Sequence, residues 1–226
     1  MPAVLPMLQA LAVALIGALP PGPPAADPVA RVDAWLAGWE TLGGRFEQVV
    51  TAPTLPGERR ESGRFEIRRP DQMRWDYESP ERKQALTDGI TTWLYTPADR
   101  QVIRGRMDRL RRDSALALLL AGSSRLKESF RIEPLEGEAG VETIRLRLTP
   151  LHPSESIDHA RLEADGASGR ILALEVLDLS GNRVLYRFSD LIENPPLEPA
   201  RFVLEIPAGV EIQDLDSAGA GAPGPP

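Results

Sequence analysis

Ser124 and Lys127 have the spacing S-x-x-K, which carries the nucleophilic serine in penicillin-recognising enzymes. That chemistry also needs S-D-N and K-T-G motifs, and the sequence contains neither. The two histidines, His152 and His159, have no cysteine or H-E-x-x-H pattern beside them to complete a metal site. A P-loop and a G-x-G-x-x-G fingerprint are also absent. The sequence therefore predicts no catalytic residue, no metal and no cofactor, and it indicates that the chain is not an enzyme.

Charge and cysteine content exclude further classes. The net charge is −7 and the isoelectric point is near 5.0, whereas nucleic-acid binders present a strongly basic surface, so no nucleic-acid partner is expected. The densest basic run, residues 104–112, holds five arginines with Asp108 among them. It is typical of the solvated start of a helix, with docking to a membrane transporter as the alternative. The absence of cysteine excludes disulfides, thiolate metal sites and a lipid-anchored cysteine.

Large apolar side chains recur on one face of a predicted strand. Met73, Trp75 and Tyr77 alternate with charged residues, so they share one face of a predicted strand. Methionine is flexible and polarizable, while tryptophan and tyrosine combine a large apolar area with a polar edge. Such side chains suit a surface that holds lipid chains, and an ordinary core is the alternative. The candidate cavity residues are Phe46, Phe65, Ile67, Met73, Trp75, Tyr77, Trp93 and Tyr95, with Leu94 competing with the last two for the inward face.

These side chains must be positioned by a strand meander between residues 45 and 104. Apolar and charged residues alternate with period two around Phe46, Phe65 and Trp75, which indicates strands with one apolar face. Proline at the second position predicts turns at residues 69–72 and 96–99. Asp88-Gly89 predicts a tight hairpin. Consecutive hairpins predict an antiparallel sheet.

Two main helices are predicted beside this meander. Asp27-Pro28 is a favoured helix start, and apolar residues then recur at helical spacing as far as Trp39, with Gly43-Gly44 expected to end the helix. Asp113 or Ser114 is expected to cap a second helix over residues 115–120, ending at Gly122, and a short helical stretch follows from Ser123.

The second half of the chain returns to strands. They are expected near residue 132 and at residues 142–149, 157–164, 170–178 and 183–192, with a last strand from Arg201 to Ile206.

The domain boundaries follow from composition. Residues 1–26 carry no charged side chain and end in prolines and small residues, which predicts a secretory signal peptide cleaved near Ala26, with an uncleaved anchor as the alternative. Residues 27–214 are expected to form a single domain. The tail, residues 215–226, consists mainly of Ser, Ala, Gly and Pro, and we expect it to be disordered.

A family resemblance rests on four ordered segments. Residues 62–102 contain an apolar strand ending in Arg-Pro, an aromatic strand around Trp75, and a hairpin of the form DG…W-x-Y followed by a strand that opens with Gln101. Phe46-Glu47-Gln48 lies upstream, and residues 202–210 lie downstream with the form F…P-x-G-V. This arrangement resembles the LolA family of lipoprotein carriers from about residue 30 to 214.

The resemblance implies an unclosed β-barrel of antiparallel strands whose concave, ligand-binding face is covered by helices. It also implies a periplasmic, monomeric carrier that takes lipid-modified proteins from an inner-membrane transporter to an outer-membrane receptor. A lipid-sensing or lipoprotein-sensing regulatory protein with the same fold is the alternative.

The resemblance further implies a lid over the cavity. Arg69 matches the family's arginine before proline, whose guanidinium would bond to the lid helix and hold the empty cavity shut, whereas a solvated strand-end arginine is the alternative. The lid residues would be Arg69, Leu116, Leu118, Leu119 and Leu120, with a plain packed helix as the other interpretation of the leucines.

Overall fold

The computed structural model describes residues 27–216 except residues 55, 121–124, 137–141 and 153–156. The predicted signal peptide, residues 1–26, and residues 217–226 of the predicted tail lie outside the described part of the chain. Leu215 and Asp216, the first residues of that predicted tail, form a turn.

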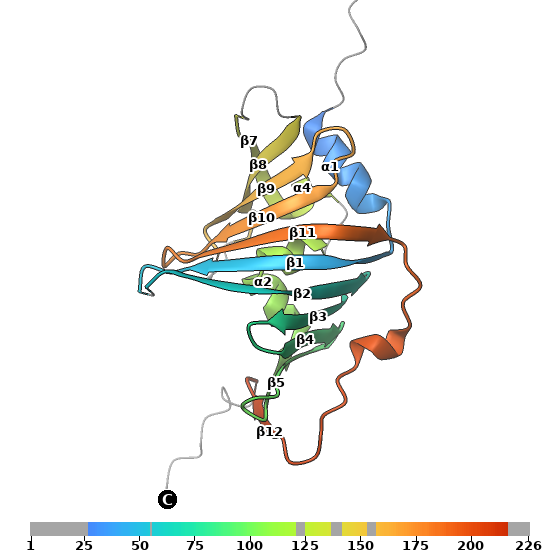
Figure 1. Cartoon of the computed structure of the whole chain (residues 1–226). Helices are drawn as coiled ribbons and strands as arrows, with labels where there is room; N and C mark the ends of the chain where they lie inside the picture. Colours follow the sequence, from blue (N-terminus) through green and yellow to red (C-terminus); the bar gives the residue numbers. More distant parts are fainter. Residues whose placement is uncertain (1–26, 55, 121–124, 137–141, 153–156, 217–226) are drawn as a thin grey trace, which may run out of the picture.

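The domain is mainly β, as predicted, and is built around one curved sheet (Figure 1). Its strands are β1 (Thr41–Thr51), β2 (Glu58–Arg68), β3 (Gln72–Ser79), β4 (Lys83–Asp88), β5 (Thr91–Thr96), β6 (Gln101–Arg106), β7 (Phe130–Pro134), β8 (Thr143–Pro150), β9 (His159–Asp165), β10 (Ile171–Leu177), β11 (Arg183–Glu193) and β12 (Glu211–Asp214).

Two antiparallel meanders join to make this sheet. The strand order is β12-β6-β5-β4-β3-β2-β1-β11-β10-β9-β8-β7, so β1 and β11 pair at the centre although they are far apart in sequence. β12 is the exception, because it runs parallel to β6. Among the described strands nothing pairs β12 with β7, and the sheet therefore stays unclosed, which confirms the predicted fold class.

Helices cover one face of the sheet, which we call the inner face. The first is α1 (Pro28–Ala37), and Asp27 caps it by accepting a 3.0 Å hydrogen bond from the Val29 N–H, as expected from the Asp-Pro pair. The expected end at Gly43-Gly44 is wrong, since α1 ends at Ala37 and both glycines lie in β1. Space at Gly44 is tight, because a Cβ there would lie 2.8 Å from Leu191 Cδ2 and 3.0 Å from the backbone oxygen of Ser189.

Three short helices connect the two meanders. They are α2 (Met107–Asp113), α3 (Ala115–Leu120) and α4 (Leu126–Ser129). The Ser114 hydroxyl accepts a 3.2 Å hydrogen bond from the Ala117 N–H and so caps α3, whereas the expected end at Gly122 lies outside the described residues. No helix in the described ranges is long and apolar enough to cross a membrane.

The segment after β11 differs from the expected last strand. Residues 201–206 are not a strand; the 3₁₀ helix η1 (Pro199–Phe202) occupies the start of this stretch, and the last strand is β12. A strand would point Arg201 and Phe202 to opposite sides, whereas a tight 3₁₀ turn lets both residues contact the sheet. Figure 1 shows the segment running from the end of β11 past the middle strands to β12 at the sheet edge.

Candidate functional site

The inner face is divided into a packed half and a hollow half. The packed half combines α1, α3 and α4 with β1, β2 and β7–β10 in one continuous apolar cluster. A pocket among side chains that include Trp35, Leu42, Phe65 and Leu120 has a volume of only about 10 Å³. This half is therefore a close-packed core.

The hollow half is a cavity of about 520 Å³ between β3–β6 and helices α2 and α3. Its size is within the usual range for small-molecule sites. Most of its wall is apolar, and its lining includes Met73, Trp75, Tyr77, Ala85, Leu94, Ile103, Leu110, Leu116 and Tyr186. The cavity therefore offers an apolar surface to a ligand.

Three of the predicted cavity residues lie in the packed core. Phe46, Phe65 and Ile67 are buried, and none of them lines the cavity. Two of them pack against the cavity wall. The Phe65 ring stacks on the Trp75 ring with 5.1 Å between ring centres, and the Phe46 and Trp75 rings meet edge to face at 4.8 Å. Met73, Trp75 and Tyr77 do line the cavity, so the aromatic cluster forms the boundary between core and hollow.

Trp93 and Tyr95 belong to the opposite face, which we call the outer face. The strand register pairs Trp75 with Ala85 and Ala85 with Leu94, so Leu94 is the β5 side chain that shares the inner face. Trp93 borders the cavity between Thr92 and Leu94, but its register partner is Leu86 on the outer face, and Tyr95 does not line the cavity.

The predicted lid helix α3 covers both halves of the inner face. Leu116 lines the cavity, Leu119 and Leu120 are buried in the core, and Leu118 is half-buried against it. The preceding helix α2 contacts β5 and β6, and Arg111 on α2 forms an ion pair with Asp71 in the turn after β2. Together the two helices roof the cavity.

Arg69 directly follows β2 and contacts the segment between α1 and β1. Its guanidinium carbon is 3.8 Å from the centre of the Trp39 ring, a cation–π arrangement, and its backbone N–H donates to Glu40 O at 2.9 Å. Its Nε and Nη2 are buried and have no acceptor among the described residues. Burial lowers the pKa of Arg69 to about 10.

A polar group at one end of the cavity was not predicted. Lys83 Nζ donates to Glu61 Oε1 at 2.7 Å and lies 4.2 Å from the centre of the Tyr77 ring, while the Tyr77 hydroxyl donates to Gln48 at 2.9 Å. Burial raises the pKa of Tyr77, and it raises that of Tyr186 to about 12, with the Glu61 charge adding to both shifts. Both phenols therefore stay neutral.

The alternation of side chains along β1 and β2 could have indicated that these polar residues point inward. Glu61 is in phase with Phe65 and Ile67 on β2, and Gln48 is in phase with Phe46 on β1, so the alternation points both polar side chains inward. Lys83 follows once β4 is paired opposite Tyr77.

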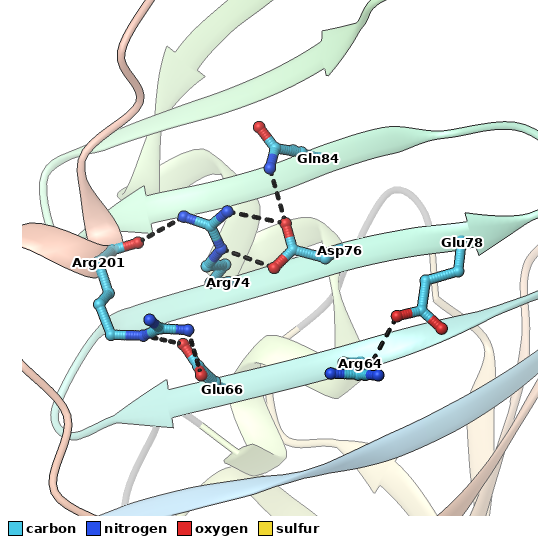
Figure 2. Close-up of polar contacts among 7 residues, drawn as sticks. All are labelled: Arg64, Glu66, Arg74, Asp76, Glu78, Gln84 and Arg201. Carbon is cyan, nitrogen blue, oxygen red and sulfur yellow. Dashed lines mark hydrogen bonds and ion pairs between the residues drawn. The ribbon is translucent and has the colours of Figure 1, made fainter.

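On the outer face, the C-terminal segment is fastened across β2–β4 by a polar network (Figure 2). Arg201 donates two hydrogen bonds to Glu66, at 2.7 and 2.6 Å, and its backbone oxygen accepts from Arg74 at 3.0 Å. Arg74 in turn donates to Asp76, which also accepts from Gln84. Phe202 is fully buried next to this network. We call residues 199–210 the outer strap.

The residues with possible catalytic chemistry are dispersed. Ser124 lies outside the described residues, and His152 is exposed after β8. His159 is buried on β9, with its Nδ1 2.6 Å from Asp158 Oδ2. In the part of the chain that the structure describes, no three His, Cys, Asp or Glu side chains are grouped as a metal site.

Comparison with known proteins gives a consistent answer. The family described as outer membrane lipoprotein carrier protein LolA matches residues 37–205. An outer-membrane lipoprotein carrier protein of Chromobacterium violaceum is 32% identical over 213 residues, which cover 93% of this chain and 99% of that protein. A protein of the same description from Pseudomonas aeruginosa is 29% identical over 185 residues, covering 81% and 86%.

A solved structure has a similar fold. An uncharacterized conserved protein from Thermus thermophilus is similar with a TM-score of 0.50 and 13% identity, over 83% of this chain and 96% of that chain. At this identity the likeness concerns the fold alone.

Proposed function

Because the chain belongs to the LolA family of outer membrane lipoprotein carrier proteins, we propose that it carries lipoproteins by binding their acyl chains in the cavity beneath α2 and α3. The observation that carries this proposal is the apolar hollow of about 520 Å³ on the helix-covered face, where a protein of purely structural role would have a filled core. We propose that the protein works in the periplasm, where it receives lipoproteins from an inner-membrane transporter and delivers them to an outer-membrane receptor.

The energetics of acyl chains suit a site of limited size. Each buried CH₂ contributes about 0.8 kcal/mol, so one chain of about 16 carbons would contribute roughly 12 kcal/mol if fully buried. A carrier that buried several chains completely would not release them. A single cavity with a roof of short helices favours partial burial, which keeps the hand-off reversible.

The roof is built from elements that can separate from the sheet. α2 and α3 have seven and six residues, and such short helices depend on tertiary contacts for their stability. Polar contacts between α2 and the sheet side include the ion pair of Arg111 with Asp71 and the hydrogen bond from Met107 N–H to Ile90 O. We propose that the roof lifts on loading and that Arg69, Leu116, Leu118, Leu119 and Leu120 set its closed position.

The experiment is an uptake and transfer assay with a matched pair of variants. Leu94→Glu places a carboxylate on the inner face of β5, in the cavity wall and at a half-buried position. Leu172→Glu makes the same exchange on the outer side of β10, where the leucine is exposed. We expect Leu94→Glu to lose uptake of lipoprotein from inner-membrane vesicles by at least about tenfold, because a charge in an apolar wall is strongly disfavoured.

The control should take up lipoprotein and deliver it to outer-membrane vesicles at the rate of the unaltered protein. Equal uptake by Leu94→Glu and Leu172→Glu would refute the cavity as the acyl site. Uptake without onward delivery by the unaltered protein would instead favour the lipoprotein-sensing alternative.

A further inference from the structure

The cavity contains one feature that acyl-chain binding alone does not explain. Among the described residues of its lining, Lys83 is the only one with a charged side chain. Its side chain is 20% exposed, and its pairing with Tyr77 across β3 and β4 places it on the inner face. Placing an ammonium group in an apolar wall has an energetic cost, so the partners of Lys83 decide which ligand groups this end of the cavity can accept.

The charge of Lys83 is balanced inside the protein. Glu61 accepts from Lys83 Nζ at 2.7 Å, and its side chain is only 8% exposed. Glu61 Oε2 is buried and has no hydrogen-bond donor within the described part of the chain, so the carboxylate remains a compact negative charge beside the ammonium. Arg59 also lies 3.6 Å from Glu61 Oε1, but its own side chain is 60% exposed and solvent screens it.

One donor of Lys83 is left for a ligand. An ammonium group has three N–H donors. One is directed to Glu61 and the ring face of Tyr77 takes up another direction, so a further N–H remains for an acceptor in the cavity. Tyr77 and Tyr186 stand beside it as neutral phenols.

We propose that the Lys83–Glu61 pair is a polar subsite that accepts a neutral carbonyl group of the acyl ester or amide at the head of the cargo's chains and rejects anionic lipid heads. The inference rests on the proposed carrier function. A neutral carbonyl can take the remaining N–H without penalty. A carboxylate or phosphate that approached Lys83 Nζ would come within about 5 Å of the Glu61 carboxylate. The repulsion at that distance cancels more than half of its attraction to the ammonium, so the cost of removing the anion from water is not recovered.

This subsite would give the carrier a needed specificity. Phospholipids and free fatty acids offer the same hydrocarbon as lipid-modified polypeptides, so an apolar wall cannot separate them. The chemical difference lies at the head, where a lipid-modified polypeptide presents neutral esters and amides. Specificity then comes from rejecting the wrong head as much as from binding the right one.

The test compares two probes on the full exported protein and on Glu61→Gln. The probes are palmitate at pH 8, which is anionic, and a neutral N-palmitoyl lipopeptide. Glutamine keeps the shape of the side chain and its acceptor for Lys83 but removes the charge. We expect Glu61→Gln to bind palmitate about tenfold more tightly, because the ammonium is no longer neutralised, and to bind the lipopeptide within about twofold of the unaltered protein.

Two further variants make the result decisive. Glu47→Gln removes a carboxylate from the other face of β1, where Glu47 pairs with Arg60, and it should leave both affinities unchanged. The double variant Glu61→Gln with Lys83→Met has no ammonium, so it should lose the palmitate gain and bind the lipopeptide about tenfold more weakly. This second effect is measurable even where the single variant folds poorly.

Failure of the subsite and failure of the carrier function give different results. If the unaltered protein binds the lipopeptide but Glu61→Gln gains no affinity for palmitate, or Glu47→Gln gains as much, the subsite is refuted and the carrier function stands. If the unaltered protein binds neither probe, the acyl-binding cavity itself is refuted.

Discussion

At the scale of single residues, Arg69 has more donors than the described structure satisfies. A buried guanidinium normally finds acceptors for its N–H groups, yet Nε and Nη2 of Arg69 have none among the described residues, and the Trp39 ring occupies one face. The lowered pKa expresses the same cost of burial. Arg69 can therefore accept a new hydrogen-bond partner, because a backbone carbonyl of the roof that approached it would gain a charged hydrogen bond.

Replacing Arg69 with leucine tests this role. We expect Arg69→Leu to retain uptake but to deliver cargo to outer-membrane vesicles about tenfold more slowly, because the charged hydrogen bond that Arg69 would gain from a roof carbonyl, worth about 1.5–3 kcal/mol, can no longer form. The free energy of unfolding should change by less than about 1 kcal/mol, since the lost cation–π contact is offset by removal of unsatisfied donors. Arg68→Leu, which breaks only a contact with Gln72, is the matched control. Delivery at the unaltered rate would make Arg69 a structural cation.

Residue types alone could predict only a minority of the residues that line the cavity. The sequence pattern predicted Met73, Trp75 and Tyr77 because hydrophobic alternation is strong on β3. The Glu61–Lys83 pair escaped prediction because its partners are 22 residues apart and meet only across two hairpins, with a register shift between Ser62 and Gly63. A buried ion pair depends on register, and no local pattern in a sequence specifies register across two hairpins.

At the scale of elements, β5 was the strand whose inward face was hardest to predict. Trp93-Leu94-Tyr95 carries apolar residues on both faces of β5, which removes the period-two signal. The outer partners Leu86 and Val102 are buried although they are not part of the inner core cluster. This sheet region is therefore covered on both sides, and only the folded chain shows which aromatic residue belongs to which side.

Truncating the anchor of the strap should release it. Phe202→Ala removes a fully buried aromatic side chain, and such changes cost about 3–5 kcal/mol. Because the strap leads into β12, we expect faster amide hydrogen exchange over residues 199–214, together with a lower unfolding free energy. Val203→Ala, at a position that is 52% exposed, should leave both properties unchanged. Unaltered exchange in Phe202→Ala would mean that the Arg201–Glu66 and Arg74 contacts hold the strap without it.

At the scale of the whole molecule, the open sheet allows one half of the inner face to be packed while the other half stays hollow. The central β1–β11 pair joins two meanders, and the packed half on β1, β2 and β7–β10 supplies a continuous core. The hollow half on β3–β6 can then remain incompletely filled without unfolding the domain. A closed barrel filled by side chains would offer no comparable space, and a fully packed sheet would bind nothing.

This division predicts how ligand and stability are coupled. A ligand that binds only the folded state stabilises it by about 2.7 kcal/mol at a free concentration of 100 times its dissociation constant. For a domain of this size that gain should raise the melting temperature by about 5–10 °C. Calorimetry with increasing N-palmitoyl lipopeptide should show a steady rise for the unaltered protein and for Leu172→Glu. Leu94→Glu should show no rise at the same concentrations, because its cavity wall carries a charge. A rise of equal size in Leu94→Glu would place the stabilising lipid elsewhere on the molecule and refute the hollow half as its site.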